Sequence, residues 1–374
     1  MDKLKVGITG QAGFLGTHLY NTLGLYPDEF ERIPFEDDFF KDIKELYEFV
    51  KRCDVIVHLA AMNRHNDPEV IYETNISLVE KLIEALDTAG NKPHVIFSSS
   101  IQEERDNMYG RSKREGREMI AKWAGSNNAL FSGLVFPNLF GPFGEPFYNS
   151  FITTFSYQLT NNQEPNIETD ASIPLLYVND AVKTIINVIR NKRSSDKIEV
   201  HYSGEYLVSD ILDILKVYKI EYFENGLIPL LNEAFEINLF NTFRSFIDQK
   251  AHNPVNLKLN TDDRGSFVET VRTHLGGQFS FSTTLPGITR GNHFHTRKIE
   301  RFAVIKGKAV IRMRRIGKEE KLEFSLDGTQ PSFVDMPVWY THNITNVGDE
   351  DLYTLFWVNE FFDPEDPDTY YEEV

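Results

Sequence analysis

The chain has 374 residues, of which 41% are hydrophobic and 25% charged, so it can bury the cores of two or three domains and is too polar for a multi-span membrane protein. Its formal net charge of −17 argues against broad binding to nucleic acid or anionic membranes, so a bound anion needs a local site. The single cysteine, Cys53, excludes an internal disulfide, and the N-terminus lacks the apolar run of a secretory signal. These features predict a cytoplasmic protein.

Through the first 200 residues, short apolar runs alternate with amphipathic stretches, which is typical of strands and helices in a doubly wound α/β fold with a parallel sheet. The runs are nearly continuous because a parallel strand is covered on both faces. The predicted strands are Leu4 to Thr9, Asp54 to Leu59, His94 to Ser100 and Ala129 to Phe136. The predicted helices are Gly13 to Leu23, Ile76 to Ala89, Gly110 to Trp123 and Val178 to Ile189.

The pattern changes towards the C-terminus. The segment Ile228 to Phe246 is typical of a helix, and Ala251 to Pro254 of a connection. From Asn256, glycines such as Gly276 and Gly277 separate short alternating runs, which indicates many antiparallel strands. Ala303 to Met313 reads as one such strand pair that turns at Gly307. We therefore predict two domains, residues 1–248 and 252–374.

A glycine-rich turn follows the first predicted strand. Thr9-Gly10-Gln11-Ala12-Gly13-Phe14-Leu15-Gly16 carries glycines in a G-x-x-G-x-x-G spacing. Such a turn lets the backbone approach a pyrophosphate at a helix N-terminus, where free N–H groups and the helix dipole favour an anion. An ordinary glycine-rich turn has the same pattern, so this motif needs support from other residues.

That support comes from the segment around residue 110. Tyr109 and Lys113 are spaced i and i+4, so both lie on one face of the predicted helix. A charged lysine lowers the pKa of a nearby phenol, which makes Tyr109 a credible acid for protonating a developing alkoxide. Upstream, Ser98-Ser99-Ser100 ends a buried strand, where a hydroxyl can hold a substrate carbonyl.

Together these residues resemble the extended short-chain dehydrogenase/reductase family. The resemblance covers most of residues 1–245 and includes His58-Leu59-Ala60-Ala61 and Pro137-Asn138-Leu139-Phe140-Gly141-Pro142. It implies that Tyr109 is the general acid, that Lys113 binds the nicotinamide ribose and tunes Tyr109, and that Ser100 orients the carbonyl, with Ser99 as the alternative. The remaining cofactor-binding residues that it implies are Gly10, Gly13, Phe14, Leu15, Gly16, Glu36, Leu59, Ala60 and Asn138. The run from Asn138 and Tyr177 to Asp180 resembles the branch that handles nucleotide sugars.

The choice of cofactor depends on the residues about 20 positions beyond the glycines, which contact the adenosine ribose. An acid there favours NAD and an arginine favours NADP. Glu36, Asp37 and Asp38 occupy this region, and Arg32 is the nearby arginine. The residues themselves favour NAD(H), unless the acids simply form a solvated loop.

A second constellation lies in the C-terminal part. His293 and His295 are two residues apart, so on a strand both side chains point to the same face. Glu300 and His342 complete a set of three imidazoles and one carboxylate, which suits Zn, Fe, Mn, Ni or Cu. A lone buried histidine is more often a hydrogen-bonded core residue, but a four-member pattern predicts a metal site.

These residues resemble the cupin family, and the resemblance covers about residues 256–374 and implies an all-β jelly-roll barrel. In the second cupin motif Trp339 occupies the position usually held by glycine, so the local geometry of that turn is expected to differ from the family pattern. The segment Asp262-Asp263-Arg264-Gly265-Ser266-Phe267 resembles the first strand of sugar-nucleotide epimerases with this fold.

The whole arrangement resembles the CapF-type enzymes of bacterial capsule biosynthesis. That resemblance implies C3 epimerisation of UDP-2-acetamido-2,6-dideoxy-β-L-arabino-hex-4-ulose in the cupin domain. The reductase domain then reduces C4, which gives UDP-N-acetyl-6-deoxy-L-talosamine in the UDP-N-acetyl-L-fucosamine pathway. It implies Zn and NADP(H), whereas Glu36 leaves NAD(H) open. A UDP-sugar is the expected partner, with no nucleic acid or membrane, and a homodimer is expected by analogy with both families.

Three other functions fit the same residues. In the first, the chain is an enzyme of the same design that acts on a dTDP-4-keto-6-deoxyhexose. In the second, it is a 4-keto sugar reductase whose cupin domain holds a structural metal and does not catalyse a reaction. In the third, the chain is a dinucleotide-sensing regulator without turnover, although intact Tyr109, Lys113 and Ser98 to Ser100 argue against this function.

Overall fold

The structure is a computed structural model that describes residues 3–148, 150–257, 259–262, 265–268, 270–273, 278–360 and 363–374. The described chain divides into two compact units. One comprises the chain up to Thr154 with Glu168–Val208, and the other comprises Phe155–Ile167 with Ser209–Val374. Each unit is described below by itself.

The N-terminal part alternates strands and helices, as the sequence predicts. Its strands are β1 (Leu4–Thr9), β2 (Phe30–Ile33), β3 (Val55–His58), β4 (His94–Ser100), β5 (Phe131–Phe136), β6 (Asn138–Phe140), β7 (Ser172–Tyr177), β8 (Ser195–Glu199) and β9 (Gly204–Leu207). Its helices are α1 (Phe14–Leu23), α2 (Ile43–Lys51), α3 (Pro68–Ala89), α4 (Met108–Asn127) and α6 (Val178–Arg190), with short 3₁₀ turns η1 (Asp37–Lys41) and η2 (Ile101–Glu104). Helix α5 (Phe151–Thr160) begins in this part, and most of it belongs to the second unit.

Six of these strands form one parallel sheet in the order β2-β1-β3-β4-β5-β8. The strand order reverses at β1, and in doubly wound sheets ligands bind beyond the carboxyl ends of the strands at such a switch point. The predicted doubly wound α/β fold of the N-terminal part is therefore confirmed. A small sheet of β6, β7 and β9 completes this part.

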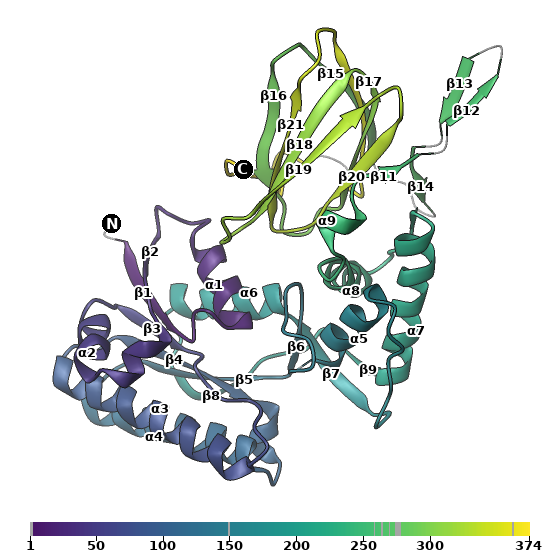
Figure 1. Ribbon diagram of the computed structural model, residues 1–374. Coiled ribbons are helices and arrows are strands. Elements are labelled where there is room, and N and C mark those ends of the chain that lie inside the picture. The colour runs from purple at the N-terminus through teal and green to yellow at the C-terminus, as the bar shows by residue number, and fades with distance from the viewer. Residues whose placement is uncertain are drawn as a thin grey trace. The chain divides into compact units, whose positions relative to one another are not determined.

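Helices cover both faces of the parallel sheet (Figure 1). Leu19 and Leu23 of α1 and Ile185 of α6 pack on one face, in a core that includes Val57 of β3. On the other face, Leu82 of α3 belongs to a second core together with residues of α2 and α4. Cys53 lies in this second core, 4% exposed, and burial raises its pKa to about 12, so it is an inert apolar side chain.

The C-terminal part begins with helices and continues as strands. The helices are α7 (Val208–Tyr218), the π-helical turn η3 (Lys219–Glu224), α8 (Ala234–Arg244) and α9 (Gln249–His252). The strands are β10 (Leu227–Ile228), β11 (Val255–Asn256), β12 (Leu259–Asp262), β13 (Gly265–Val268), β14 (Arg272–Thr273), β15 (Gln278–Thr284), β16 (Thr289–Phe294), β17 (Glu300–Lys306), β18 (Lys308–Arg315), β19 (Lys321–Asp327), β20 (Ser332–Met336), β21 (Tyr340–Asn346), β22 (Leu352–Val358) and β23 (Tyr370–Tyr371). The predicted helix from Ile228 is thus shorter, because β10 and a turn precede α8.

Two five-stranded sheets face each other, in the orders β11-β20-β17-β22-β15 and β19-β18-β21-β16-β23 (Figure 1). Their pairings are antiparallel, and inward side chains such as Ile311, Val334 and Ile344 form one core between them. This arrangement confirms the predicted all-β barrel. Of the predicted first strand, Asp263 and Arg264 lie outside the described residues, as do Gly276 and Gly277.

The strand pair expected to turn at Gly307 differs from the prediction. β17 pairs with β20 and β22, whereas β18 pairs with β19 and β21, so the two strands belong to opposite sheets. Gly307 has φ +86°, and a Cβ there would lie 3.1 Å from Leu352 Cα. The glycine therefore turns the chain from one sheet to the other, which strand periodicity alone does not distinguish from a hairpin.

A buried polar cluster explains why residues 209–252 pack in the same compact unit as the barrel. Arg301 of β17 donates from Nε to Asp335 Oδ1 of β20 at 2.8 Å, and from Nη1 to the Gly226 carbonyl at 3.1 Å. The Tyr222 hydroxyl of η3 also donates to Asp335. These contacts cross position 250, and the predicted division into residues 1–248 and 252–374 stays a prediction. Among the described helices, none combines the length and apolar character needed to cross a bilayer.

Candidate functional site: a Ser-Tyr-Lys set and a candidate metal centre

The glycine turn sits at the end of β1. Gly10 has φ +70°, and a Cβ there would lie 2.8 Å from the Ala60 backbone nitrogen, while a Cβ at Gly16 would lie 2.2 Å from the Gly10 oxygen. The turn therefore requires glycine at both positions. Gly13 is the N-cap of α1, and all residues of this helix are described. No side chain caps the helix, and its first turn contains no acidic residue. Its N–H groups are available to an anion, as expected for a pyrophosphate.

The other predicted cofactor-binding residues lie around this turn. The Leu59 N–H donates to the Thr9 carbonyl at 3.1 Å, so Leu59 and Ala60 follow β3 directly beside the turn. The Leu15 side chain packs against the core, which leaves its backbone for a cofactor. Phe14 contacts His18 edge-to-face at 5.3 Å between ring centroids.

Two further residues of that group lie at strand ends. Glu36 is exposed, three residues beyond the end of β2. Asn138 is the first residue of β6, and its amide donates to the Pro174 carbonyl at 3.4 Å. Arg32 instead stacks on the Tyr20 ring at 4.4 Å and donates to the Tyr20 carbonyl at 3.2 Å.

The three serines at the end of β4 are not equivalent. Ser98 and Ser100 are half-buried and share one side of the strand, whereas Ser99 is buried on the other side. The Ser99 hydroxyl donates to Glu103 Oε2 at 2.6 Å, and that carboxylate also accepts from Arg117 Nε at 3.0 Å. Ser99 is therefore committed to a buried ion pair, which favours Ser100 as the residue that orients a carbonyl.

Helix α4 carries Tyr109 and Lys113 one turn apart. Its start packs against η2, since a Cβ at Gly110 would lie 1.9 Å from the Gln102 oxygen. Asn107 caps the helix by accepting the Gly110 N–H at 2.7 Å. Lys113 is buried, and its Nζ lies 4.8 Å from the centroid of the Phe97 ring of β4. The glycine thus brings the phenol and ammonium to the end of the serine-bearing strand.

The electrostatics of this pair differ from the expectation that lysine lowers the phenol pKa. Burial, with a smaller effect of Tyr148, raises the pKa of Tyr109 to about 12. Burial also lowers the pKa of Lys113 to about 8. Burial disfavours the charged form of each group, so the phenol pKa rises and the ammonium pKa falls. At neutral pH Tyr109 holds its proton and Lys113 is charged.

Sequence reasoning missed Asn75, which connects two segments around this site. Its Oδ1 accepts from the Met62 N–H at 2.7 Å, and its Nδ2 donates to the Met62 carbonyl at 3.1 Å and to Ser112 Oγ at 3.0 Å. Asn75 therefore holds the segment after β3 against the residue that precedes Lys113. The available signal was an amide on the buried face of an otherwise apolar helix stripe.

The second predicted constellation does converge. The ligand atoms of His293, His295, Glu300 and His342 all lie within 4.8 Å of one another. His293 and His342 are paired across β16 and β21, while Glu300 enters from β17 of the opposite sheet. Glu300 Oε2 lies 2.9 Å from His295 Nε2 and 3.2 Å from His342 Nε2.

These atoms fit a metal ion. His295 Nε2, Glu300 Oε2 and His342 Nε2 are buried, and none has a hydrogen bond of good geometry from the described residues. Burial lowers the pKa of His293 to about 4, so this imidazole is neutral and able to ligate. Burial opposes ionisation of Glu300, but His295 and His342 outweigh it and hold the Glu300 pKa well below its usual value. Burial lowers the His295 pKa, but Glu300 and Asp368 outweigh it and hold this pKa above its usual value. A Zn-type ion takes neutral imidazoles and ionised carboxylates as donors, so its binding would displace any proton held between His295 and Glu300.

The unusual Trp339 adopts the backbone conformation of the glycine it replaces. Its φ is +61°, in the left-handed region that favours glycine. The Trp339 N–H donates to the His295 carbonyl at 2.8 Å, and its ring stacks on Phe294 at 5.4 Å. The turn is therefore formed although a tryptophan occupies the glycine position, and the indole ring of Trp339 packs on Phe294.

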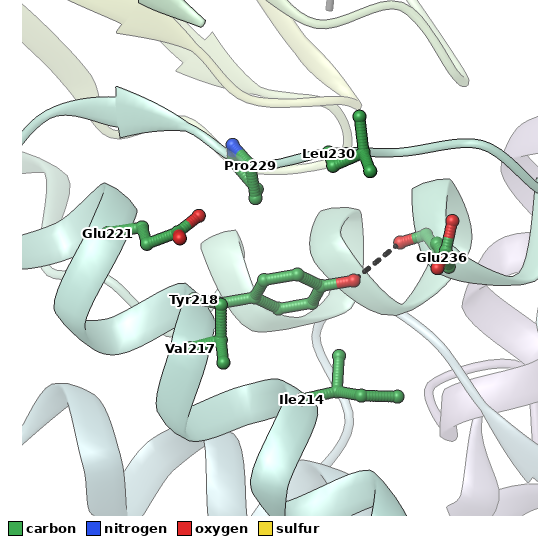
Figure 2. Close-up of a pocket in the computed structure, with 7 residues that line it drawn as sticks. All are labelled: Ile214, Val217, Tyr218, Glu221, Pro229, Leu230 and Glu236. Carbon is green, nitrogen blue, oxygen red and sulfur yellow. Dashed lines mark hydrogen bonds between the residues drawn. The ribbon is translucent and has the colours of Figure 1, made fainter. Parts of the chain in front are cut away.

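A separate pocket of about 540 Å³ lies among α7, η3, the segment after β10 and α8 (Figure 2). The Tyr218 hydroxyl, which points across it, donates to the Glu236 carbonyl at 3.2 Å. Its lining residues are Ile214, Val217, Tyr218, Glu221, Pro229, Leu230 and Glu236. This pocket contains none of the predicted site residues.

A doubly wound unit with a glycine turn and a Ser-Tyr-Lys set, followed by a barrel with a His₃Glu cluster, defines an extended short-chain dehydrogenase/reductase joined to a cupin. Residues 6–203 match the NAD dependent epimerase/dehydratase family, and residues 260–370 match the polysaccharide biosynthesis C-terminal domain. The chain belongs to the NAD dependent epimerase/dehydratase family and, within it, to the CapF-type enzymes. It is therefore an NAD(P)-dependent oxidoreductase, and the epimerase/reductase role holds at the level of the family.

The individual relatives match along the whole chain. A UDP-2-acetamido-2,6-beta-L-arabino-hexul-4-ose reductase of Pseudomonas aeruginosa is 33% identical over 373 residues, 98% of each chain. The crystal structure of the capsular polysaccharide assembling protein CapF from Staphylococcus aureus is 35% identical, with a TM-score of 0.64 over 99% of this chain and 100% of that one. A structure of CapF with the inhibitor 3-isopropenyl-tropolone is 32% identical, with a TM-score of 0.58 over the same shares.

Proposed function

We propose that the chain is a bifunctional nucleotide-sugar enzyme. It epimerises C3 of UDP-2-acetamido-2,6-dideoxy-β-L-arabino-hex-4-ulose and then reduces the C4 ketone. The product is UDP-N-acetyl-6-deoxy-L-talosamine, on the route to UDP-N-acetyl-L-fucosamine for a surface polysaccharide. The observation that carries the proposal is the match to the Pseudomonas aeruginosa reductase over 98% of both chains. Both sets of site residues in this chain support it.

In the reduction, the nicotinamide supplies the hydride that becomes the new C4–H bond. The Ser100 hydroxyl donates a hydrogen bond to the C4 carbonyl oxygen, and Tyr109 transfers its phenolic proton to that oxygen, which yields the alcohol. The raised pKa of Tyr109 keeps this proton in place at neutral pH. Charged Lys113 then stabilises the phenolate that Tyr109 becomes, until a solvent proton restores it.

The epimerisation precedes the reduction. The C4 carbonyl acidifies the neighbouring C3–H bond, so a base can remove that proton and an acid can return one to the opposite face. Once C4 is an alcohol, the C3 proton is no longer acidic. We assign this step to the barrel, where Tyr340 and His342 lie two residues apart on β21 and form part of the wall. Burial raises the Tyr340 pKa, so this phenol is protonated and able to return a proton.

We assign zinc to the cluster of His293, His295, Glu300 and His342. The ligand atoms of these four residues converge. His295, Glu300 and His342 each contribute a buried atom that has no hydrogen bond of good geometry from the described residues, which supports this assignment. When bound, the ion supplies Lewis-acid stabilisation of a carbonyl or enolate oxygen.

For the nicotinamide we propose NADP(H), as the family resemblance implies, with NAD(H) as the second candidate. The placement of Glu36 and Arg32 favours the second, because Glu36 is exposed beyond β2 and Arg32 is engaged with Tyr20. We further propose that residues 1–248 carry the reduction and residues 252–374 the epimerisation, in a homodimer.

Proton NMR of the purified protein with the UDP-4-keto sugar in deuterium oxide tests both steps in one sample. We expect the C3 proton signal to disappear before any nicotinamide is present. Added NADPH or NADH should then remove the ketone, and the faster cofactor is the preferred one. Reduction without prior C3 exchange refutes the epimerase and leaves a 4-keto reductase, and competition by UDP against dTDP separates the two nucleotide substrates.

The substitution Tyr109→Phe separates the two sites. We expect it to abolish ketone reduction and to leave C3 exchange at the wild-type rate. Tyr72→Phe is the matched control, because this phenol of α3 donates to Glu115 outside the Ser-Tyr-Lys set. Oxidation of the nicotinamide by Tyr109→Phe at the wild-type rate contradicts the assignment of Tyr109.

A further inference from the structure

The buried residue Asp368 makes an unusual set of contacts. It is 2% exposed, and its carboxylate accepts from three consecutive backbone N–H groups. Thr296 N lies 3.1 Å from Oδ1, and Arg297 N and Lys298 N lie 2.9 and 3.1 Å from Oδ2. The Thr296 hydroxyl donates to Oδ1 at 2.6 Å. The carboxylate therefore organises the whole segment 296–298.

That segment connects two members of the proposed metal set. His295 precedes it, and Glu300 follows after one more residue. Its conformation thus decides how far the imidazole of His295 stands from the carboxylate of Glu300, whose Oε2 is 2.9 Å from His295 Nε2. Without the carboxylate of Asp368, three adjacent N–H groups would lose their common acceptor.

The backbone of Asp368 acts on the ligand itself. His295 Nδ1 is hydrogen-bonded to the Asp368 carbonyl oxygen. A carbonyl only accepts, so Nδ1 carries a proton, and in the neutral imidazole that ligates a metal Nε2 therefore presents its lone pair to the cluster. This is the arrangement by which groups outside a metal site select the tautomer and orientation of a histidine ligand.

The chain around Asp368 is held in place independently. Lys298 Nζ donates to the Pro367 carbonyl at 2.6 Å, and β23 pairs with β16 so that Tyr371 lies opposite His293. Tyr370 stacks on Phe294, the last residue of β16, at 5.4 Å between ring centroids, and Phe294 lies between His293 and His295 in the chain. The C-terminal segment is therefore held on both sides of Asp368, by Lys298 before it and by β16 after it.

We propose that Asp368 is a positioning residue of the metal centre, which sets the tautomer of His295 and the spacing between His295 and Glu300. The inference rests on the proposed metal site and assigns a role to a residue outside the ligand set. Removal of such outer groups costs metal sites about 10- to 100-fold in affinity. A residue that merely stabilises the fold would change unfolding without changing the environment of the ion.

Asp368→Asn is the sharpest perturbation. Asp368 has φ +41°, a left-handed conformation that asparagine tolerates, so the carbonyl contact to His295 can persist. The amide keeps one acceptor oxygen and turns an NH₂ group towards N–H donors. Asp363→Asn is the matched control, because Asp363 is exposed and accepts the Glu365 N–H within its own turn at 2.9 Å. Thr296→Val removes the hydroxyl bond alone and provides a milder variant if Asp368→Asn does not fold.

The measurements are Zn²⁺ affinity of the full-length protein by chelator competition and the visible absorption spectrum of its Co²⁺ form. We expect Asp368→Asn to lose about 10- to 100-fold in Zn²⁺ affinity and to shift the Co²⁺ bands. Thr296→Val should lose a smaller factor, and Asp363→Asn should match the wild type. The positioning role is overturned if Asp368→Asn keeps the wild-type Zn²⁺ affinity and an unchanged Co²⁺ spectrum. If only Thr296→Val folds, the same result in that variant overturns it. A wild-type protein that binds neither ion overturns the metal site itself.

Discussion

Glu103 offers the most direct test of how the residues around Ser100 and Tyr109 are held together. This residue of η2 is 2% exposed, and its carboxylate accepts from Ser99 Oγ, Arg117 Nε and Arg117 Nη2 at 2.6, 3.0 and 3.3 Å. Glu103→Ala removes the acceptor oxygens of all three hydrogen bonds and leaves a buried guanidinium whose Nη1 still donates to the Asp196 carbonyl. Breaking one side of a buried ion pair costs about 3–5 kcal/mol, because the remaining charge is uncompensated.

The assay is urea unfolding of Glu103→Ala and Glu104→Ala, followed by a tryptophan or circular dichroism signal. Glu104 is the control, since its side chain is 70% exposed and pairs with Lys197 at 2.9 Å. We expect a loss of about 3–5 kcal/mol for the first variant and about 0–1 kcal/mol for the second. Equal losses refute the reasoning that Glu103 holds the segment between Ser100 and Tyr109.

The pH dependence of the same pair has a definite sign. Burial would raise the pKa of Glu103, but Ser99, Arg117 and Lys197 outweigh it and the pKa lies below the usual value. A depressed carboxyl pKa contributes stability above the pKa of the unfolded chain, and this contribution is lost as pH falls through the folded pKa. The stability difference between wild type and Glu103→Ala should therefore shrink below about pH 4.

Three further predictions concern single residues. Gly110→Ala places a methyl group 1.9 Å from the Gln102 oxygen, so NADPH oxidation should fall about 100-fold. Gly125→Ala is the control in the same helix and should keep full activity, because no atom lies within 4 Å of the added methyl group. The pKa of Lys113 is about 8 in the folded protein, so the unfolded chain binds this proton more tightly. The free energy of unfolding should therefore rise between about pH 8 and 10, and Lys113→Met should lack this rise in denaturant titrations. Trp339→Gly should be about 0.5–1 kcal/mol more stable than Trp339→Ala, because φ +61° strains alanine; the opposite order in thermal unfolding contradicts that strain.

Much of the candidate site could be predicted from the sequence because its chemistry is local. The spacing of Tyr109 and Lys113 follows from the helix repeat, and that of His293 and His295 from the strand repeat. In the first turn Gly10 has a positive φ, and a Cβ at Gly16 would clash with the Gly10 oxygen, so two of the glycines are required by local geometry. Alternation of apolar runs and helices likewise predicted a parallel sheet, because burial on both faces removes polar residues from its strands.

Other features depended on contacts between residues far apart in the chain. Ser99 and Ser100 are chemically identical, and only the buried pair of Glu103 and Arg117 separates their roles. The phenol of Tyr109 has a raised pKa because packing removes water from it, which no spacing rule contains.

The barrel shows the same division between sequence and structure. The strand period identified His293 and His295, but it did not reveal that β17 and β18 enter opposite sheets, nor that Asp368 returns to hold His295. Side-chain periodicity reports the faces of a single element, whereas sheet partners and hydrogen bonds across 73 residues depend on how the elements pack. The sequence by itself therefore determined which chemical groups each site contains, and the tertiary structure decided which of them are desolvated, oriented and held together.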